Sequence, residues 1–230
     1  MHPFKKKMQV GIIRFPGSNC DFDTLNFFKK FGHKSRFIWH KDTKLPHIDL
    51  LVLPGGFAFG DRFYKKATDK YIIDPGAMAM RSPAMQIVRL ATKRKLPILG
   101  ICNGFQILVK ARLLPGKLVR NDSGKFFCDY VKCKIVDNSF FQDEALQNKT
   151  FVVPVAHGYG KYLIDKKELQ ALEKSRQIFL KYKDFNPNGS VNNIAGVSNK
   201  DGNIFGMMPH PERSPDGKYF MRAMEKYVRK

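Results

Sequence analysis

Short apolar runs alternate along the first half of the chain with segments of helical spacing. Four runs have the continuous or alternating pattern of buried strands, at 9–15, 35–39, 49–54 and 96–101. Helical spacing is found at 23–32, which ends on Gly32, and at 80–95. A rhythm of strands and helices predicts an α/β fold, with an open, mainly parallel sheet and helices on both of its faces.

The second half of the chain has a different pattern. Strand-like runs separated by turn residues occur at 117–121, 125–136, 149–158, 177–183, 192–199 and 203–210. Such closely spaced runs predict a small antiparallel extension of the fold. The last segment, 216–230, has helical spacing and predicts a terminal helix.

The 230 residues are 43% hydrophobic and contain no repeat and no Pro-rich or Ser-rich tract, which predicts a single domain over residues 1–230. The first apolar stretch has only about five residues before Arg14, too few for a signal peptide. No run approaches the roughly 20 apolar residues of a membrane span. The four cysteines have no CxxC spacing, which favours a reducing, cytoplasmic location.

The charge is strongly basic, with 41 Lys and Arg against 20 Asp and Glu, a formal net charge of +21. Such an excess suggests a polyanionic partner. The lysines, however, are scattered in pairs and triplets, and the sequence has no zinc knuckle, RGG tract or RNP-type aromatic motif. Specific nucleic-acid binding is therefore not favoured, and phosphorylated metabolites or an acidic partner remain open.

A candidate nucleophile lies in the segment LGICNGFQ at 99–106. Cys102 follows a buried apolar run and precedes a helical one, and a glycine lies two residues away on each side. This is the arrangement of a nucleophile elbow, with sulfur in place of the serine oxygen. The helix that begins at Asn103 directs its positive end at Cys102, which favours the thiolate. Most lone cysteines are packing residues, so this interpretation requires a base.

The segment MMPHPER supplies a candidate base and acid, His210 and Glu212. Prolines on both sides of the histidine favour extended backbone, and in extended backbone residues two apart point to the same side. The carboxylate of Glu212 would then orient the imidazole of His210, which completes a cysteine–histidine–acid triad. The alternative is an exposed turn with a solvated histidine and glutamate.

Acyl chemistry also requires N–H donors for a developing oxyanion. The segment PGGF at 54–57 follows a predicted strand, and its Gly56 is the first candidate donor. The backbone N–H of Asn103, directly after the nucleophile, is the second by the geometry of an elbow.

Six motifs together resemble a known family: FPGSNCDFD, LPGGFAFGD, GICNGFQ, LLPGKLVRN, PVAHGYGKY and GMMPHPER. The chain is similar to the class I (triad) glutamine amidotransferases, from about Val10 to Arg213. Within them it most resembles the glutaminase subunits of the phosphoribosylformylglycinamidine synthases of purine biosynthesis. The implied fold is flavodoxin-like.

The resemblance implies that Cys102 forms a γ-glutamyl thioester from glutamine, that His210 carries protons, and that Glu212 orients His210. The ammonia would pass to a separate ATP-dependent synthetase subunit, and a third small subunit is left open. The implied substrate contacts are Gln106, Ala156, Gly158 and Tyr159, and His157 is expected to be structural or substrate-positioning. No metal or cofactor is expected in this chain, since ATP and Mg²⁺ would be used by the partner.

Residues 62–75 are longer than the family's usual connection, and they are expected to cover the site, dock the partner or decorate the surface. Cys20 has no flanking elbow, so a structural or interface role is expected. Two alternative functions are kept: another cysteine hydrolase of the same fold, and a non-catalytic, basic nucleic-acid-binding protein.

Overall fold

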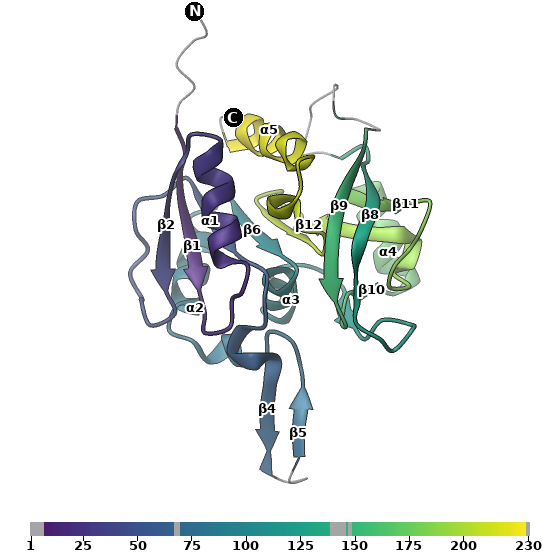
Figure 1. Ribbon diagram of the computed structural model, residues 1–230, viewed down its shortest axis with the longest axis horizontal. Coiled ribbons are helices and arrows are strands. Elements are labelled where there is room, and N and C mark those ends of the chain that lie inside the picture. The colour runs from purple at the N-terminus through teal and green to yellow at the C-terminus, as the bar shows by residue number, and fades with distance from the viewer. Residues whose placement is uncertain (1–6, 67–69, 139–145, 147–148, 229–230) are drawn as a thin grey trace, which may run out of the picture.

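The computed structural model describes residues 7–66, 70–138, 146 and 149–228 (Figure 1). Its main feature is a nine-stranded sheet with the order β2-β1-β3-β6-β13-β12-β11-β8-β9. Five neighbouring strands are parallel: β1 (Gln9–Arg14), β2 (Lys34–Trp39), β3 (Leu50–Leu53), β6 (Ile98–Ile101) and β13 (Ile204–Met207). Along the sheet these five follow the 2-1-3-4-5 order of flavodoxin-like folds, so the predicted fold class is confirmed.

The antiparallel extension continues the same sheet. It consists of β12 (Ile194–Ser198), β11 (Ile178–Lys183), β8 (Phe127–Ile135) and β9 (Thr150–His157). One assignment was incomplete: the run 203–210 was counted with the antiparallel part, and its strand β13 does pair antiparallel with β12, but on its other side it runs parallel to β6. All four residues of β13 are buried, so its sequence lacks the alternation that would mark a half-exposed antiparallel strand.

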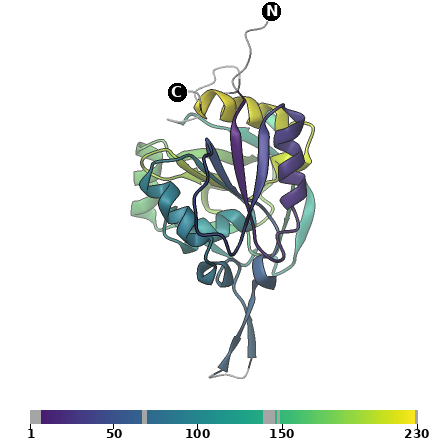
Figure 2. The ribbon, with the colours of Figure 1, turned by 90° about the vertical axis from the view of Figure 1, so that its left-hand side faces the viewer.

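Helices cover both faces of the sheet, as predicted. They are α1 (Asp21–Lys30), α2 (Met85–Lys93), α3 (Asn103–Lys110), α4 (Lys166–Lys174) and α5 (Gly217–Val228). In the edge-on view the purple α1 lies on the opposite side of the sheet from the teal helices α2 and α3 (Figure 2). No helix in the described ranges is long and apolar enough to cross a membrane.

Smaller elements complete the fold. Two two-stranded sheets pair β4 (Arg62–Lys65) with β5 (Lys70–Ile73) and β7 (Lys117–Val119) with β10 (Lys161–Leu163). Short 3₁₀ helices are η1 (Ala58–Asp61), η3 (Met78–Arg81), η4 (Val191–Asn193) and η5 (Pro211–Arg213). The sequence analysis did not anticipate α4 or β10, because α4 is mostly exposed and β10 has three residues.

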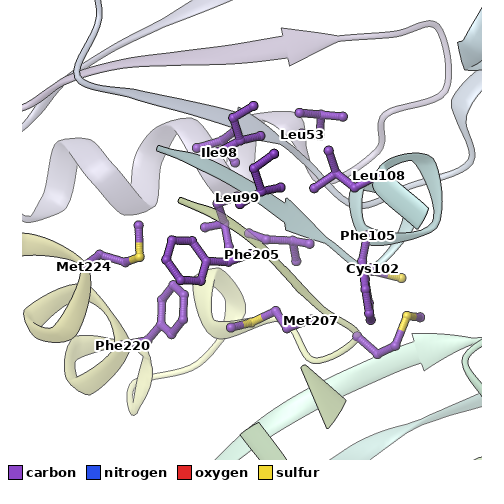
Figure 3. Packing of buried hydrophobic residues seen from close by; sticks show 14 of the residues in the cluster. Leu53, Ile98, Leu99, Cys102, Phe105, Leu108, Phe205, Met207, Phe220 and Met224 are labelled. Carbon is purple, nitrogen blue, oxygen red and sulfur yellow. The ribbon is translucent and has the colours of Figure 1, made fainter. Parts of the chain in front are cut away.

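The apolar core joins the parallel strands to the helices on both sides (Figure 3). Phe105 of α3 and Phe205 of β13 are both 0% exposed. Burying a side chain of this size stabilises the fold by about 1.5–3 kcal/mol. Cys102 belongs to the same buried cluster, at the carboxyl end of β6. The core therefore fixes the position of the candidate nucleophile.

Gly104 allows α3 to approach the sheet, because a Cβ atom at this position would lie 2.0 Å from the carbonyl oxygen of Leu53. We predict that Gly104→Ala destabilises the protein by about 3 kcal/mol, since either the helix or β3 must shift. Urea denaturation would measure the change. The exposed α4 substitution Gln170→Ala is the control and should change the free energy of unfolding by less than about 0.5 kcal/mol. Equal stabilities of both variants would contradict the close packing.

Candidate active site

Cys102 lies at a sharp turn between β6 and α3. Its backbone has φ 49° and ψ −103°, a conformation that is strained for a residue with a side chain. The Cys102 N–H donates to the carbonyl oxygen of Met207 at 2.7 Å, which ties the turn to the end of β13. The predicted elbow is present, and its thiol is oriented toward Ala156, with Sγ 3.8 Å from the carbonyl oxygen.

His210 and Glu212 follow directly after β13, beside the elbow. The Nδ1 atom of His210 lies 2.7 Å from Oε1 of Glu212, and the two side chains are 2% and 0% exposed. A carboxylate can only accept, so Nδ1 carries the shared proton. Nε2 has no partner that meets hydrogen-bond geometry in the described part of the chain, but the thiols of Cys102 and Cys20 both lie near enough to raise the pKa of His210.

The predicted His210–Glu212 contact is present, but extended backbone does not produce it. Pro211–Arg213 form the 3₁₀ helix η5, which begins after His210. Within this turn the carboxylate reaches back to the preceding imidazole. The His210 N–H is held by the carbonyl oxygen of Pro154 in β9, at 2.9 Å. Both sheet halves therefore position the histidine.

Charge controls the protonation of His210. Burial alone would lower its pKa, but the charges of Glu212 and Cys102 raise the pKa well above the ordinary value of 6.5. Protonated His210 is thus the form that this environment favours when the thiol is ionised. Such an arrangement supports an imidazolium–thiolate pair.

His157 is also buried, but its electrostatics are the opposite. Burial and the positive charge of His210 lower its pKa from 6.5 to about 4. Its Nε2 lies 3.5 Å from Nδ2 of Asn188, and its backbone oxygen accepts from Asn121 at 2.9 Å. A histidine held neutral by its surroundings is poorly suited to hold the catalytic proton, and the structural or substrate-positioning role expected for it stays a prediction.

Cys20 lies closer to the candidate triad than the sequence suggested. Each of Cys20, His210 and Glu212 has one atom that could bind a metal ion, and these three atoms lie within 4.8 Å of one another. A thiolate, an imidazole and a carboxylate are suitable ligands for Zn²⁺. A metal ion bound there would compete for the groups that orient and protonate His210.

Gly56 lies in a loop that a second loop supports. Its φ is +134°, and a Cβ atom would lie 2.4 Å from the backbone nitrogen of Asn19, so only glycine fits. The Phe57 N–H donates to the oxygen of Gly17 at 2.7 Å, and the Cys20 N–H donates to the oxygen of Gly55 at 3.3 Å. The motif FPGSNCD thus holds the PGG loop in place.

The other candidate donor, Asn103, is held by its side chain. Its Nδ2 donates to Oδ1 of Asp61 at 3.0 Å and to Oε1 of Gln106 at 2.9 Å, and its Oδ1 accepts from the N–H of Ala58 at 3.0 Å. As the first residue of α3, Asn103 has a backbone N–H without an intrahelical partner. That N–H is available for an oxyanion.

Asp61 is a residue that the sequence analysis did not identify. Its pKa is raised, because the effect of burial outweighs the hydrogen bonds from Gly76 and Asn103, which act in the opposite direction. Its carboxylate joins the N-terminus of α3 to the segment that follows β5. The final aspartate of LPGGFAFGD was the available signal, but its partners are 15 and 42 residues away.

A cavity of about 400 Å³ opens above Cys102. Its lining includes Gly56, Cys102, Gln106, Ala156, His157, Gly158 and Tyr159. All four predicted substrate-contact residues are therefore brought together. Gln106, however, is already engaged, since its Nε2 donates to the oxygen of Tyr159 at 2.7 Å and its Oε1 accepts from Asn103. It shapes the cavity wall. The volume suits a small ligand.

Comparison with known proteins matches this geometry to a family. The CobB/CobQ-like glutamine amidotransferase domain matches residues 7–226. The chain is 43% identical over 227 residues to the phosphoribosylformylglycinamidine synthase subunit PurQ of Wolinella succinogenes, covering 94% of this chain and 99% of that protein. It is 41% identical over 232 residues to the subunit of the same name from Nostoc sp., covering 96% and 99%.

A solved structure agrees with the sequence relatives. A chain in the structure of PurLQS from Thermotoga maritima superimposes with a TM-score of 0.82 at 35% identity, covering 96% of this chain and 99% of that chain. The α/β fold agrees with this match. The chain therefore belongs to the family of CobB/CobQ-like glutamine amidotransferase domains.

Proposed function

We propose that the chain is the glutaminase subunit of a phosphoribosylformylglycinamidine synthase, the hydrolase component of a C–N ligase in purine biosynthesis. It hydrolyses glutamine to glutamate and supplies ammonia to an ATP-dependent synthetase subunit. The observation that carries the chemistry is the strained Cys102 beside the His210–Glu212 pair at a cavity. The near full-length likeness to the PurQ subunits supports the reaction and the partner.

Each residue of the site has its own role in the hydrolysis of glutamine. The thiolate of Cys102 attacks the side-chain amide carbon of glutamine, and the backbone N–H groups of Gly56 and Asn103 stabilise the oxyanion. His210 gives its proton to the departing ammonia, and a γ-glutamyl thioester remains. His210 then takes a proton from water, whose attack on the thioester releases glutamate and restores the Cys102 thiolate. Glu212 keeps His210 oriented throughout.

The resemblance to PurLQS also bears on assembly and conditions. We propose that the chain works as one domain in a complex with the synthetase subunit and a third, small subunit. The chain itself would need no metal or cofactor, because none of its proposed steps uses one. The cysteines of the described ranges are free, which suits the cytoplasm and a working thiolate.

Two alternatives differ in what they predict. Another cysteine hydrolase of the same fold would hydrolyse peptides and leave glutamine intact. A non-catalytic nucleic-acid-binding protein would be retained on DNA or RNA in a salt-sensitive way, and its Cys102 would not react with a glutamine-like electrophile. Neither alternative is favoured by a specific feature of the site.

Removing the nucleophile should separate the two halves of the reaction. With Cys102→Ala we expect glutamine-dependent synthesis by the complex to fall by at least about a thousandfold, because no thioester can form. Ammonia-dependent synthesis by the partner should be unchanged. The exposed Cys128→Ala is the control and should keep both activities. Loss of both activities in Cys102→Ala would contradict a separate ammonia source.

Removing the negative charge beside His210 should change the pH profile. In Glu212→Gln the pKa of His210 falls, because burial then acts with less opposition. We expect kcat to decrease by about 10²–10⁴-fold, and the pH above which activity declines to move lower. Steady-state glutaminase assays across pH would measure both. A reduced kcat with an unchanged pH profile would argue for a purely structural Glu212.

His157 should make the protein sensitive to acid. Its folded-state pKa of about 4 lies below the unfolded value of about 6.5, so the unfolded chain binds the proton first. Its contribution to stability is full above pH 6.5 and is lost as the pH falls toward 4, by about 3 kcal/mol. Denaturation of His157→Gln should therefore show a shallower loss of stability over this window. An equally steep loss would refute the assignment.

A further inference from the structure

The ribbon formed by β4 and β5 extends from the body of the protein. Each strand pairs only with the other within the described ranges, and neither joins the nine-stranded sheet. Figures 1 and 2 both show the ribbon projecting on the side opposite the two chain termini. A two-stranded ribbon without a core is marginally stable in water.

The root of the ribbon borders the candidate active site. Arg62, Ile73 and Pro75 line the cavity above Cys102. Asp61 precedes β4, and its carboxylate accepts from the N–H of Gly76 after β5, at 3.1 Å. The ribbon is thus anchored at the mouth of the cavity.

Apolar side chains are exposed around this mouth. Phe57 is 47% exposed, Phe126 is 53% exposed, and their ring centroids lie 6.4 Å apart. On the ribbon, Ile73 is 45% exposed and Tyr71 is 73% exposed. Neighbouring exposed apolar groups, with aromatic ones among them, are typical of protein–protein interfaces.

Positive charge surrounds the apolar groups. Arg62, Lys66 and Lys70 are exposed on the ribbon, and Arg120 and Lys125 are exposed across the mouth. In the part of the chain that the structure describes, the nearby carboxylates are buried or already paired. Asp61 is buried, Asp74 pairs with Lys110, and Asp122 pairs with Lys161.

We propose that the ribbon and the mouth of the cavity form the surface that binds the synthetase subunit, through an apolar patch on that subunit bordered by carboxylates. This proposal rests on the function proposed above. Ammonia formed at Cys102 must leave through a path closed to water, so the receiving subunit has to cover the opening. The positively charged residues around the mouth of the cavity call for an acidic partner surface.

Docking at the ribbon also affects the oxyanion site, because hydrogen bonds connect the two. Asp61 binds Gly76 at the ribbon's root and Asn103 at the start of α3, and the N–H of Asn103 is the proposed oxyanion donor. A partner that fixes the ribbon therefore fixes Asn103. It follows that the synthetase should stimulate the glutaminase reaction, and that this stimulation requires the ribbon.

The test compares the double variant K66E/K70E and the single variant Tyr71→Ala with K166E/K167E on α4, which changes the charge equally, away from the ribbon (Figure 1). Binding to the synthetase subunit of the same organism is measured by biolayer interferometry at low and moderate salt. We expect Kd to rise at least about tenfold for the two ribbon variants, with a weaker salt dependence for K66E/K70E. K166E/K167E should bind like the parent.

Activity assays separate the binding surface from the chemistry. The ribbon variants should keep the basal glutaminase activity of the isolated chain, yet lose stimulation and glutamine-dependent synthesis at subunit concentrations near the parent Kd. Parent-like binding and stimulation in K66E/K70E and Tyr71→Ala would overturn the docking surface and leave the proposed function intact. If the parent chain itself gave the synthetase no ammonia, the proposed function would fail instead.

Discussion

The strained turn at Cys102 is the constraint on which the rest of the structure depends. A residue with φ 49° between a buried strand and a helix persists only where its surroundings fix it. Here β13 supplies the carbonyl oxygen that holds the Cys102 N–H, and Gly104 lets α3 pack against β3. Because the turn lies at the carboxyl ends of parallel strands, the thiol faces a cavity that other loops can furnish.

Those loops form two layers, one that lines the cavity and one that supports the lining residues. The inner layer carries the groups proposed to act on glutamine, and hydrogen bonds from an outer layer of distant segments hold these groups in place. The FPGSNCD loop supports the loop of Gly56, and Asp61 supports Asn103. This arrangement connects the chemistry to the surface, since Asp61 also binds the root of the exposed ribbon.

Sequence alone predicted what local patterns determine. The apolar run before Cys102, its two flanking glycines and the helix after it are contiguous, and so is the His210–Glu212 pair. The direction of β13 was missed because a fully buried strand carries no alternation. Asp61 and Cys20 were missed as neighbours of the site, since their contacts join residues far apart in the chain. The ribbon's place at the cavity mouth likewise depends on tertiary structure.

The central claim is that Cys102 is a thiolate activated by His210 toward glutamine. Mass spectrometry after incubation with a diazo-ketone analogue of glutamine tests it most directly. We expect one adduct, on Cys102 and not on Cys20, that forms more slowly in His210→Gln and is suppressed by excess glutamine. Labelling of Cys20 instead, or an equal rate on Cys102 without His210, would contradict it.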